Sequence, residues 1–447
     1  MEVKPSNPKG TRDFSPAEMA RRNHIFDACR RIFQKYGYLP IETPSLEKRE
    51  TLTGKYGDEG DKLIFNVLDS GDYLSDLPDG VDKNDVKSLT GAISGKALRY
   101  DLTVPFARYV VQHQNDITFP FKRFQIQPVW RADRPQKGRY REFYQCDIDV
   151  IGSRSLMNEV ELLLIINEVF TALGLGHISI SINNRKVLAG VSEAYGIQDK
   201  FVDMVTALDK WDKIGKDGVG EELGKRGFDS ATVEKILTYA TTNNLEELKS
   251  LAGDSQVEKG IEELNTVLES LKELNISNVA YEPTLARGID YYTGIIIEVK
   301  VEDFPGSLCA GGRYDDLTGL FGLKDVSGVG VSFGADRIYD VLEQANAFPD
   351  GITATTQLMI ANFGAEEAAY GLKLVTRLRE DGIHAELYPD AAKMKKQMAY
   401  ADAKSIRYVA LAGSDEIADG KITLKDMESG DQQSVTEVEL YEILKRD

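Results

Sequence analysis

The sequence lacks most of the features that assign a protein class at once. Cys29, Cys146 and Cys309 are the three cysteines of the 447 residues, and they form no CxxC pair. Scattered thiols of this kind are typical of a reducing cytoplasm and offer no zinc site. There is no run of about 18 apolar residues for a membrane span, and the N-terminal start has no apolar segment of a secretory signal. We therefore expect a cytoplasmic protein that does not contact a membrane.

Histidine and positive charge are also scarce. The 4 histidines are dispersed and predict no metal cluster, and no Ser/His/Asp or Cys/His arrangement indicates a nucleophile. A formal net charge of −18 argues against indiscriminate binding of nucleic acid. Residues 121–142 depart from this average, with seven basic and two acidic side chains. A basic segment in an acidic protein predicts a confined site for a polyanion.

The order of patterns along the chain indicates several parts. A chain of 447 residues predicts about three domains. Residues 17–36 show apolar side chains at helical spacing, and Gly37 ends that helix. Residues 69–97 are polar and rich in glycine, which predicts a long loop. Residues 155–173 favour another helix, and the acidic stretch from about 185 to 275 is typical of an inserted helical module.

Strand patterns surround that helical stretch. Residues 121–152 alternate with a period of two, which predicts two antiparallel strands joined by the basic loop 132–141. Further strand patterns occur at 295–301 and 328–333. Beyond residue 351, strand and helix patterns alternate, which predicts a small α/β domain.

Polar side chains on these strands are candidate ligands. Arg131, Gln145 and Asp149 share one parity, which indicates either a recognition surface or a solvated outer face. Asp147 has the same parity, but nothing in the pattern gives it a role. Asp101 and Thr103 are two apart in an expected strand, where they could bind an ammonium group together or form an ordinary strand end.

Residues 285–294 are the most informative segment of the chain. Arg287 is a permanent cation suited to a carboxylate or phosphate, and Tyr291 and Tyr292 can orient a small polar ring. The alternative is a surface arginine followed by two core tyrosines. Such arginines with polar partners favour chemistry by positioning and charge neutralisation, as in phosphoryl or nucleotidyl transfer.

Two glycine-containing segments complete the candidates. Gly311 and Gly312 either let the backbone approach a ligand or form a turn. Residues 328–337 run from a glycine-spaced strand into a helix with Arg337 in its first turns, an arrangement that could accept a nucleotide phosphate.

Taken together, these segments resemble one family, the histidyl-tRNA synthetases, which are class II aminoacyl-tRNA synthetases. Residues 9–13 resemble the family's N-terminal signature and residues 36–44 its motif 1, which builds the dimer interface in class II enzymes. Residues 121–131 with 138–145 are similar to motif 2, and 328–337 to motif 3. Residues 285–294 and 310–315 match the two histidine-specific segments. The aspartates at positions 101 and 149 look more like those of eukaryotic members of the family, since many bacterial members have glutamate at the matching positions.

The resemblance implies a fold and a domain division. It implies an α/β (α+β) protein whose class II catalytic core, at residues 1–184 and 276–345, has an antiparallel sheet with helices. Residues 185–275 would form a helical insertion domain and 353–447 a C-terminal α/β anticodon-binding domain. The implied partners are L-histidine, ATP, tRNA(His) and a second copy of the chain in a homodimer. Mg²⁺ would accompany ATP, and no structural metal is implied.

The resemblance also implies a role for each matching residue. Arg287 and Arg131 would be catalytic, at the substrate carboxylate and the ATP α-phosphate. The implied histidine-binding residues are Asp101, Thr103, Gln145, Asp149, Arg287, Tyr291, Tyr292 and Tyr314. The implied ATP-binding residues are Arg131, Arg139, Phe143 and Arg337, and those at the tRNA acceptor end are Arg134, Gln136 and Lys137.

The implied activity is the ATP-dependent ligation of histidine to tRNA through a histidyl-adenylate, releasing AMP and pyrophosphate. Three other functions share part of the pattern: a non-catalytic paralogue that regulates histidine biosynthesis, a sensor of uncharged tRNA, and a class II synthetase for another amino acid. The histidine-specific segments and the expected C-terminal domain favour the ligase over the paralogue, and residues 287–292 favour it over a synthetase for another amino acid. The sensor would need an attached kinase domain, and the sequence has no kinase-like glycine loop or His-Arg-Asp motif.

Overall fold

The computed structural model describes residues 4–56, 60–75, 77–78, 80–251, 255–286, 291–302, 304–353 and 356–446. It divides into two compact units. The larger unit comprises Met1–Asp13 and Arg22–Ala347, and the smaller unit comprises Phe14–Arg21 and Phe348–Asp447.

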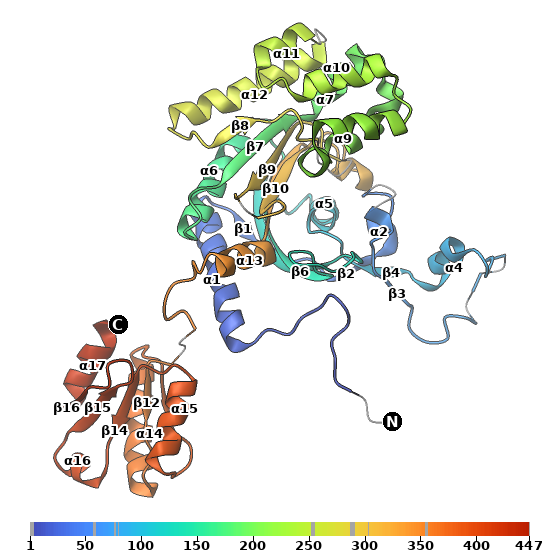
Figure 1. The fold of residues 1–447 in the computed structure, drawn as a ribbon. Coiled ribbons are helices and arrows are strands. Elements are labelled where there is room, and N and C mark those ends of the chain that lie inside the picture. The colour runs from blue at the N-terminus through green and yellow to red at the C-terminus, as the bar shows by residue number, and fades with distance from the viewer. Residues whose placement is uncertain are drawn as a thin grey trace. The chain divides into compact units, whose positions relative to one another are not determined.

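An eight-stranded sheet forms the centre of the larger unit (Figure 1), in the strand order β1-β5-β6-β11-β10-β9-β7-β8. Its strands are β1 (Leu39–Pro40), β5 (Phe121–Trp130), β6 (Glu142–Ile151), β7 (Ser179–Asn184), β8 (Val279–Tyr281), β9 (Ile295–Lys300), β10 (Cys309–Tyr314) and β11 (Gly328–Gly334). The edge pairs β1–β5 and β7–β8 are parallel, whereas the inner pairs are antiparallel. The predicted mixed fold with a largely antiparallel sheet is confirmed, as are the predicted strands.

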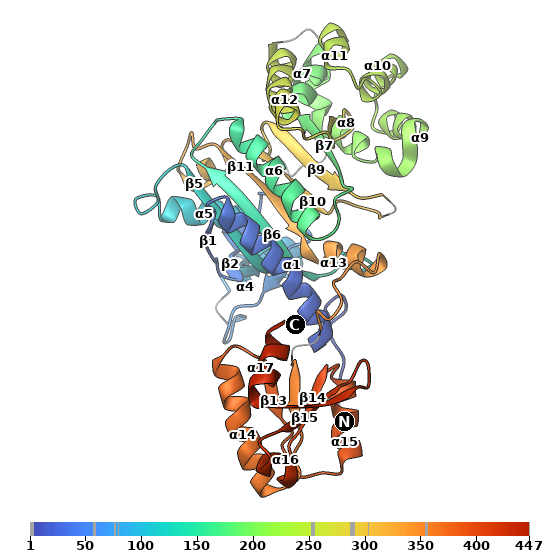
Figure 2. The ribbon, with the colours of Figure 1, turned by 90° about the vertical axis from the view of Figure 1, so that its left-hand side faces the viewer.

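Two helices, α1 (Pro16–Lys35) and α6 (Met157–Ala172), cover one face of this sheet (Figure 2). Phe33 of α1 packs 5.6 Å, between ring centroids, from Phe333 of β11, and Phe170 of α6 packs 5.7 Å from the same ring. These aromatic side chains are fully buried, so apolar burial holds both helices on this face. The polar residues of β5 and β6 consequently face the other way.

Shorter elements lie beside the opposite face. They are α2 (Arg49–Leu52), α5 (Thr103–Gln112), the 3₁₀ turn η2 (Thr318–Phe321) and a three-stranded sheet of β2 (Leu46–Lys48), β4 (Lys96–Leu98) and β3 (Asn66–Val67). The apolar side of α5, including Val104 and Phe106, forms one buried cluster with Ile151 and Tyr314. This cluster fixes the start of α5 next to the sheet.

Two predictions for this region are wrong. The expected loop at 69–97 contains the helix α4 (Val86–Ile93), because the Asp85 carboxylate accepts hydrogen bonds from the backbone of Lys87 and Ser88 and so caps its first turn. Asp101 is not in a strand. Strand β4 ends at Leu98, and Asp101 instead accepts a hydrogen bond from the backbone N–H of Val104 at the start of α5.

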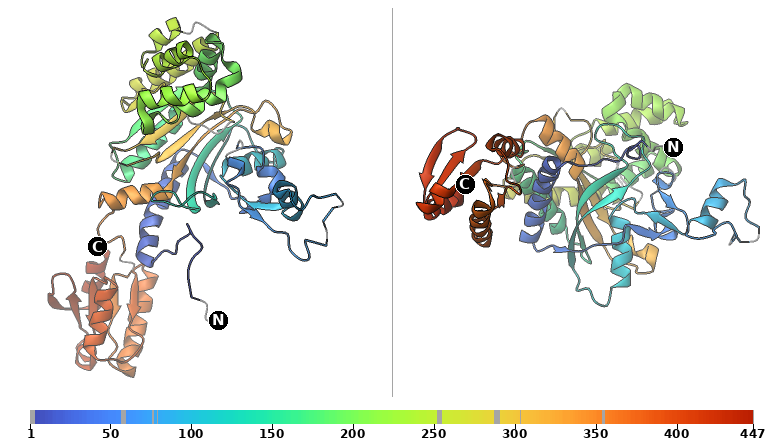
Figure 3. Two further views of the ribbon diagram at one scale, coloured as in Figure 1. Left: turned by 45° about the vertical axis from the view of Figure 1, so that its right-hand side comes forward. Right: turned by 90° about the horizontal axis from the view of Figure 1, so that it is seen from below.

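A helical module lies between β7 and β8 and sits at one end of the sheet (Figure 3). Its elements are α7 (Arg185–Ala194), η1 (Gln198–Lys200), α8 (Phe201–Leu208), α9 (Trp211–Lys225), α10 (Ser230–Ala240), α11 (Leu245–Leu251) and α12 (Ser255–Glu273). The chain returns through β9, β10 and β11 and ends this unit with α13 (Ala335–Gln344).

The smaller unit has its own five-stranded sheet, in the order β13-β12-β14-β15-β16. Its strands are β12 (Leu358–Ile360), β13 (Ala385–Leu387), β14 (Tyr408–Leu411), β15 (Ile422–Asp426) and β16 (Gln432–Val435), and its helices are α14 (Ala365–Glu380), α15 (Met394–Ala403), α16 (Ser414–Ala418) and α17 (Glu437–Arg446). The alternation predicted from residue 357 to 412 is confirmed, and the last two strands and α17 extend it. Among the residues described in both units, no helix has the length and apolar character that crossing a bilayer requires.

Candidate active site

The polar face of β5, β6 and β11 forms what we call the pocket floor, defined by Arg123, Gln145, Asp147, Asp149 and Ser332. In the register, Arg123 lies opposite Asp149, and Ser332 lies opposite Asp147. Residues two apart on a strand face the same side, so the shared face predicted for Gln145 and Asp149 is confirmed. Gln145, Asp147 and Asp149 are 8%, 2% and 3% exposed. The alternative of a solvated outer face is therefore wrong.

Asp149 is held from two sides. The Tyr314 hydroxyl donates to its Oδ1 at 2.6 Å, and Nη2 of Arg123 lies 2.7 Å from its Oδ2. Burial raises the pKa of the Asp149 carboxyl, while Arg123 and the Tyr314 hydroxyl oppose that rise. Arg123 is itself fully buried, with its guanidinium 4.3 Å from the centroid of the Phe106 ring. The result is a carboxylate fixed in one orientation.

Three glycines make room for the side chains of the site. A Cβ at Gly330 would lie 2.0 Å from Oδ1 of Asp149, and one at Gly328 would lie 2.3 Å from the Tyr314 ring. At Gly312 it would lie 3.0 Å from the Tyr292 ring. Gly311 and Gly312 belong to strand β10, so the alternative of a turn is wrong. The glycine spacing in these strands lets a carboxylate and two aromatic rings lie flat on the sheet.

Asp101 forms a second anchored carboxylate. The Tyr56 hydroxyl donates to its Oδ1 at 2.8 Å, and the Tyr291 hydroxyl lies 3.4 Å from its Oδ2. Burial raises the pKa of Asp101, with the Tyr56 hydrogen bond as the largest opposing cause. Thr103, the first residue of α5, hydrogen-bonds to Tyr291.

Tyr291 and Tyr292 both pack against the apolar cluster beside α5. Their rings meet edge to face with centroids 5.0 Å apart. Burial raises the pKa of the Tyr292 hydroxyl, and Asp149 and Asp101 raise it further. Both tyrosines are thus packing residues whose hydroxyls also lie near the two carboxylates. Arg287, predicted for the same segment, lies outside the described residues.

Arg313 serves the opposite face of the sheet. Its guanidinium binds both carboxylate oxygens of Glu159 on α6 at 2.6 Å and donates to the Ser327 hydroxyl. Successive residues on a strand face opposite sides, so Tyr314 enters the site while Arg313 fastens α6 to β10. Of these two neighbouring residues, Arg313 therefore has a structural role, and Tyr314 lies at the candidate site.

Arg131 lies at the edge of the pocket floor. Its Nε donates to the Tyr100 carbonyl at 3.1 Å, and its guanidinium lies 4.2 Å from the Tyr100 ring and 5.2 Å from the Phe143 ring. Two aromatic faces therefore fix the plane of this cation. The structure thus brings Arg131 and Phe143, both implied by the family resemblance, into contact.

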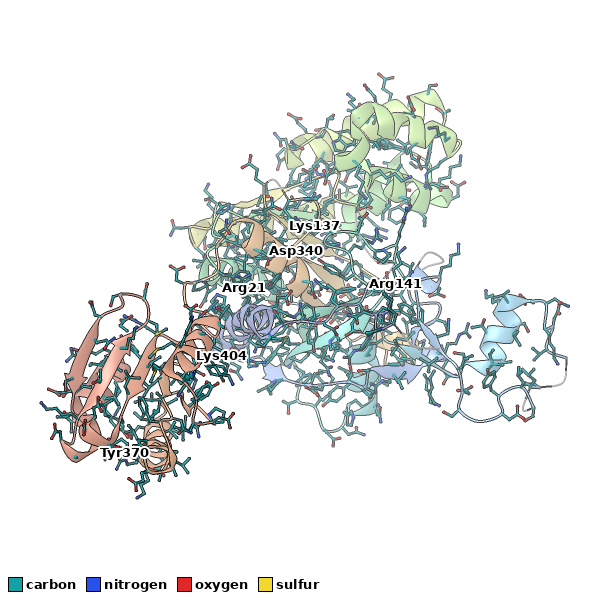
Figure 4. All side chains as sticks on the ribbon, turned by 60° about the horizontal axis from the view of Figure 1, so that its bottom comes forward. Arg21, Lys137, Arg141, Asp340, Tyr370 and Lys404 are labelled. Carbon is teal, nitrogen blue, oxygen red and sulfur yellow. The ribbon has the colours of Figure 1, made fainter. Side chains whose placement is uncertain are left out.

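The basic loop 132–141 contacts α13. Arg337 donates from Nε to the Gly138 carbonyl at 3.1 Å and from Nη1 to the Ser307 carbonyl at 2.9 Å. Lys137 is exposed and lies near Asp340 (Figure 4). Burial raises the pKa of Asp340, and the Tyr140 hydroxyl, Arg12 and Lys137 oppose that rise. Arg134 and Gln136 are also exposed, while Arg139 is paired with Asp133 at 2.8 Å.

Sequence reasoning missed three residues that shape this site. Arg123 and Tyr56 hold the two carboxylates, and the parity of Arg123 with Gln125 and Gln127 on β5 was a usable signal. Arg12 forms an ion pair with Asp336 of α13 and stacks 3.3 Å above the centroid of the Tyr140 ring in the basic loop. No local pattern links residue 12 to residue 336, so this contact was not predictable from spacing.

Comparison with known proteins gives one consistent family. A family model described as histidyl-tRNA synthetase matches residues 10–75 and 85–338, and one described as anticodon binding domain matches 357–447. A histidine–tRNA ligase of Christiangramia forsetii is 55% identical over 97% of this chain and 98% of its own length. The one from Bacteroides fragilis is 53% identical, with 100% of each chain covered.

Solved structures agree with these matches. A crystal structure of histidyl-tRNA synthetase from Nostoc sp. superposes with a TM-score of 0.83 at 31% identity, with 100% of both chains covered. A Bacillus halodurans chain titled as an ATP phosphoribosyltransferase regulatory subunit/histidyl-tRNA synthetase superposes with a TM-score of 0.74 at 21% identity, over 90% of this chain and 97% of that one. At that lower identity, the second likeness shows the fold alone.

Proposed function

The chain belongs to the histidyl-tRNA synthetase family, and we propose that the pocket on its eight-stranded sheet is where histidine is activated and joined to tRNA. The reaction is the ATP-dependent ligation of histidine to its transfer RNA through a histidyl-adenylate, with release of pyrophosphate and AMP. The observation that carries the assignment is the pocket floor, where buried carboxylates with fixed partners stand next to half-buried aromatic residues.

The imidazole of histidine is assigned to Asp149 and Tyr292. Tyr314 and Arg123 hold the Asp149 carboxylate in place, so it can accept an N–H of the ring without reorganising. The Tyr292 hydroxyl would serve the other ring nitrogen. A pocket that bonds both nitrogens rejects other amino acids because they leave buried polar groups without partners.

The α-ammonium group is assigned to Asp101, Thr103 and Gln145. The hydrogen bond from Tyr56 keeps one Asp101 oxygen oriented, which leaves the carboxylate to bind the cation. Arg287 would neutralise the substrate carboxylate and the α-phosphate as they react. The carboxylate oxygen attacks that phosphorus, and pyrophosphate leaves, so no side-chain nucleophile is required.

ATP is assigned to the edge of the pocket floor. Arg131, held between Tyr100 and Phe143, would bind the α-phosphate, and Arg337 would bind the γ-phosphate end with help from Arg139. A guanidinium fixed by aromatic faces loses little freedom on binding phosphate, which favours this role. Mg²⁺ would enter with ATP and screen its phosphate charges.

The tRNA would contact both units. The exposed side chains Arg134, Gln136 and Lys137 of the basic loop would meet the acceptor end, since Arg134 and Lys137 supply positive charge next to the ATP site. Residues 353–447 would act as the anticodon-binding domain, residues 185–275 as a helical insertion, and residues 1–184 with 276–345 as the catalytic core. Two copies of the chain would form a homodimer through the region of β1.

Arg131→Ala tests the assignment of this edge to ATP. We expect histidine-dependent ATP–pyrophosphate exchange to fall by roughly a hundredfold or more, because charge stabilisation of this kind is worth several kcal/mol in a transition state. Arg154→Ala is the control. Arg154 is also an arginine, with an exposed side chain 3.8 Å from Asp325 and away from the pocket floor. Exchange by Arg131→Ala at the level of this control would remove Arg131 from the reaction.

A further inference from the structure

Asp147 lies at the centre of the pocket floor, between Gln145 and Asp149 on β6. It is 2% exposed, and its Oδ1 accepts no hydrogen bond from the described residues. Buried carboxylate oxygens nearly always have a donor, because leaving one without a partner costs the desolvation of the group. The position of this oxygen therefore indicates a donor that arrives with a ligand.

Ser332 ties Asp147 to Gln145. The amide Nε2 of Gln145 donates to the Ser332 hydroxyl at 2.6 Å, and that hydroxyl hydrogen-bonds to the Asp147 carboxylate. Because the amide nitrogen is engaged, Gln145 keeps its Oε1 as a second buried acceptor without a donor among the described residues. Asp149 differs in part. The Tyr314 hydroxyl donates to its Oδ1, and its Oδ2, which accepts no hydrogen bond from the described residues, forms an ion pair with Arg123 at 2.7 Å. Among the described residues of the pocket floor, the buried acceptors with neither a hydrogen bond nor an ion pair are thus Oδ1 of Asp147 and Oε1 of Gln145.

The charges of the pocket point to a cationic ligand. Among the described residues, the carboxylates Asp101, Asp147 and Asp149 lie close together, with the guanidinium groups of Arg123 and Arg131 near them. Burial raises the pKa of Asp147 to about 7, and Asp149 and Asp101 add to the rise, while Arg123 and the Ser332 hydroxyl oppose it. A cation bound beside Asp147 favours the charged form of its carboxyl and so takes the place of the proton.

We propose that Asp147 is a further specificity residue of the pocket, which binds the α-ammonium group of the amino-acid substrate together with Gln145. An ammonium group offers three N–H donors and no acceptor, which matches two buried acceptors, one of them on a carboxylate, whose side chains are linked through Ser332. A ligand that lacks the ammonium group leaves these oxygens without donors. The inference rests on the proposed binding of histidine to this pocket.

The test measures the binding of three ligands to the full chain by calorimetry. They are L-histidine, L-histidinol, which keeps the ammonium group but has no carboxylate, and 3-(imidazol-4-yl)propionate, which has no ammonium group. Asp147→Asn should weaken histidine and histidinol by about tenfold or more, the worth of a charge-assisted hydrogen bond. Binding of the propionate should stay within about twofold. Equal weakening of all three ligands, or unchanged binding of histidinol, would overturn the proposal.

Glu159→Gln is the matched control. It also removes a buried carboxylate from this unit, but on the opposite face of the sheet, where Glu159 binds Arg313. Any loss it causes should be shared by all three ligands. If Asp147→Asn does not fold, as judged by thermal unfolding, Asp147→Ser takes its place with the same expected ratios.

Proton release gives a second readout. Histidine binding at pH 7, measured in two buffers of different protonation enthalpy, should release more protons from the unaltered protein than from Asp147→Asn, since burial raises the pKa of Asp147 to about 7 and a bound ammonium group favours its charged form. Equal release by both proteins would overturn the proposal. Absence of histidine-dependent exchange in the unaltered protein would instead contradict the proposed function, so the two failures are distinguishable.

Discussion

Gly330→Ala should weaken histidine binding by adding a single methyl group. The added Cβ would lie 2.0 Å from Oδ1 and 2.4 Å from Cγ of Asp149, and 2.6 Å from the carbonyl oxygen of Ile148. The carbonyl belongs to the backbone of β6, which pairs with β11 at this position. The carboxylate therefore has to move, and it leaves Tyr314 and Arg123 when it does.

The magnitude follows from two separate costs. Overpacking a well-packed site lowers the free energy of unfolding by about 1–3 kcal/mol. A displaced Asp149 also no longer accepts the imidazole N–H, and a hydrogen bond to a charged group is worth about 1.5–3 kcal/mol. At about 1.4 kcal/mol per tenfold, histidine affinity should fall by roughly 10- to 150-fold, and the affinity for ATP should change little.

Gly334→Ala is the control on the same strand. A Cβ there would meet the Leu308 carbonyl oxygen at 3.6 Å, which is ordinary contact, and Gly334 has a φ of −81° that alanine adopts freely. Calorimetry with histidine, together with thermal unfolding, separates the two costs. Gly330→Ala that binds histidine as tightly as Gly334→Ala would refute the placement of Asp149 against the imidazole.

Two further predictions concern residues 285–294. Arg287→Ala should nearly abolish adenylate formation while the temperature of unfolding stays unchanged, because a cation at the reacting carboxylate and phosphate acts only during the reaction; near-normal pyrophosphate exchange would exclude Arg287 from the chemistry. Tyr292→Phe should raise the histidine KM in the same assay by about tenfold, for one hydrogen bond of about 1–1.5 kcal/mol, with the ring packing against Gly312 retained. An unchanged KM would show that the hydroxyl bonds elsewhere.

The sequence predicted part of the pocket floor because strand geometry has a strict period, but it gave no role there to Arg123, Asp147 or Ser332. Alternation along residues 121–152 was sufficient to place Gln145 and Asp149 on one face, and the register confirms it. Alternation does not tell which face of a sheet is buried, so the sequence did not decide between a buried recognition surface and a solvated outer face. Only the packing of α1 and α6 on the other face decides between them.

Predictions failed where the local structure depends on a single capping side chain or on one hydrogen bond. The helix α4 depends on its cap at Asp85, and a short helix in a polar, glycine-rich segment has little apolar periodicity to reveal it. Asp101 was placed in a strand because it follows residues 98–100 and shares its parity with Thr103. Its carboxylate instead bonds to the start of α5.

The roles of Tyr314 and Arg313 show a third limit. Both stand in the segment 310–315, and the family resemblance gives a role only to the tyrosine. The structure explains the difference, since Arg313 binds Glu159 of α6, more than 150 residues earlier in the chain. Long-range ion pairs of this kind follow from topology and have no local sequence signature.

We expect this pocket to select histidine. ATP–pyrophosphate exchange with each of the proteinogenic amino acids in turn measures that selectivity. We expect exchange with histidine alone, because the oriented Asp149 carboxylate and the Tyr292 hydroxyl match both imidazole nitrogens. Exchange with a different amino acid, or with none of them, would contradict the account.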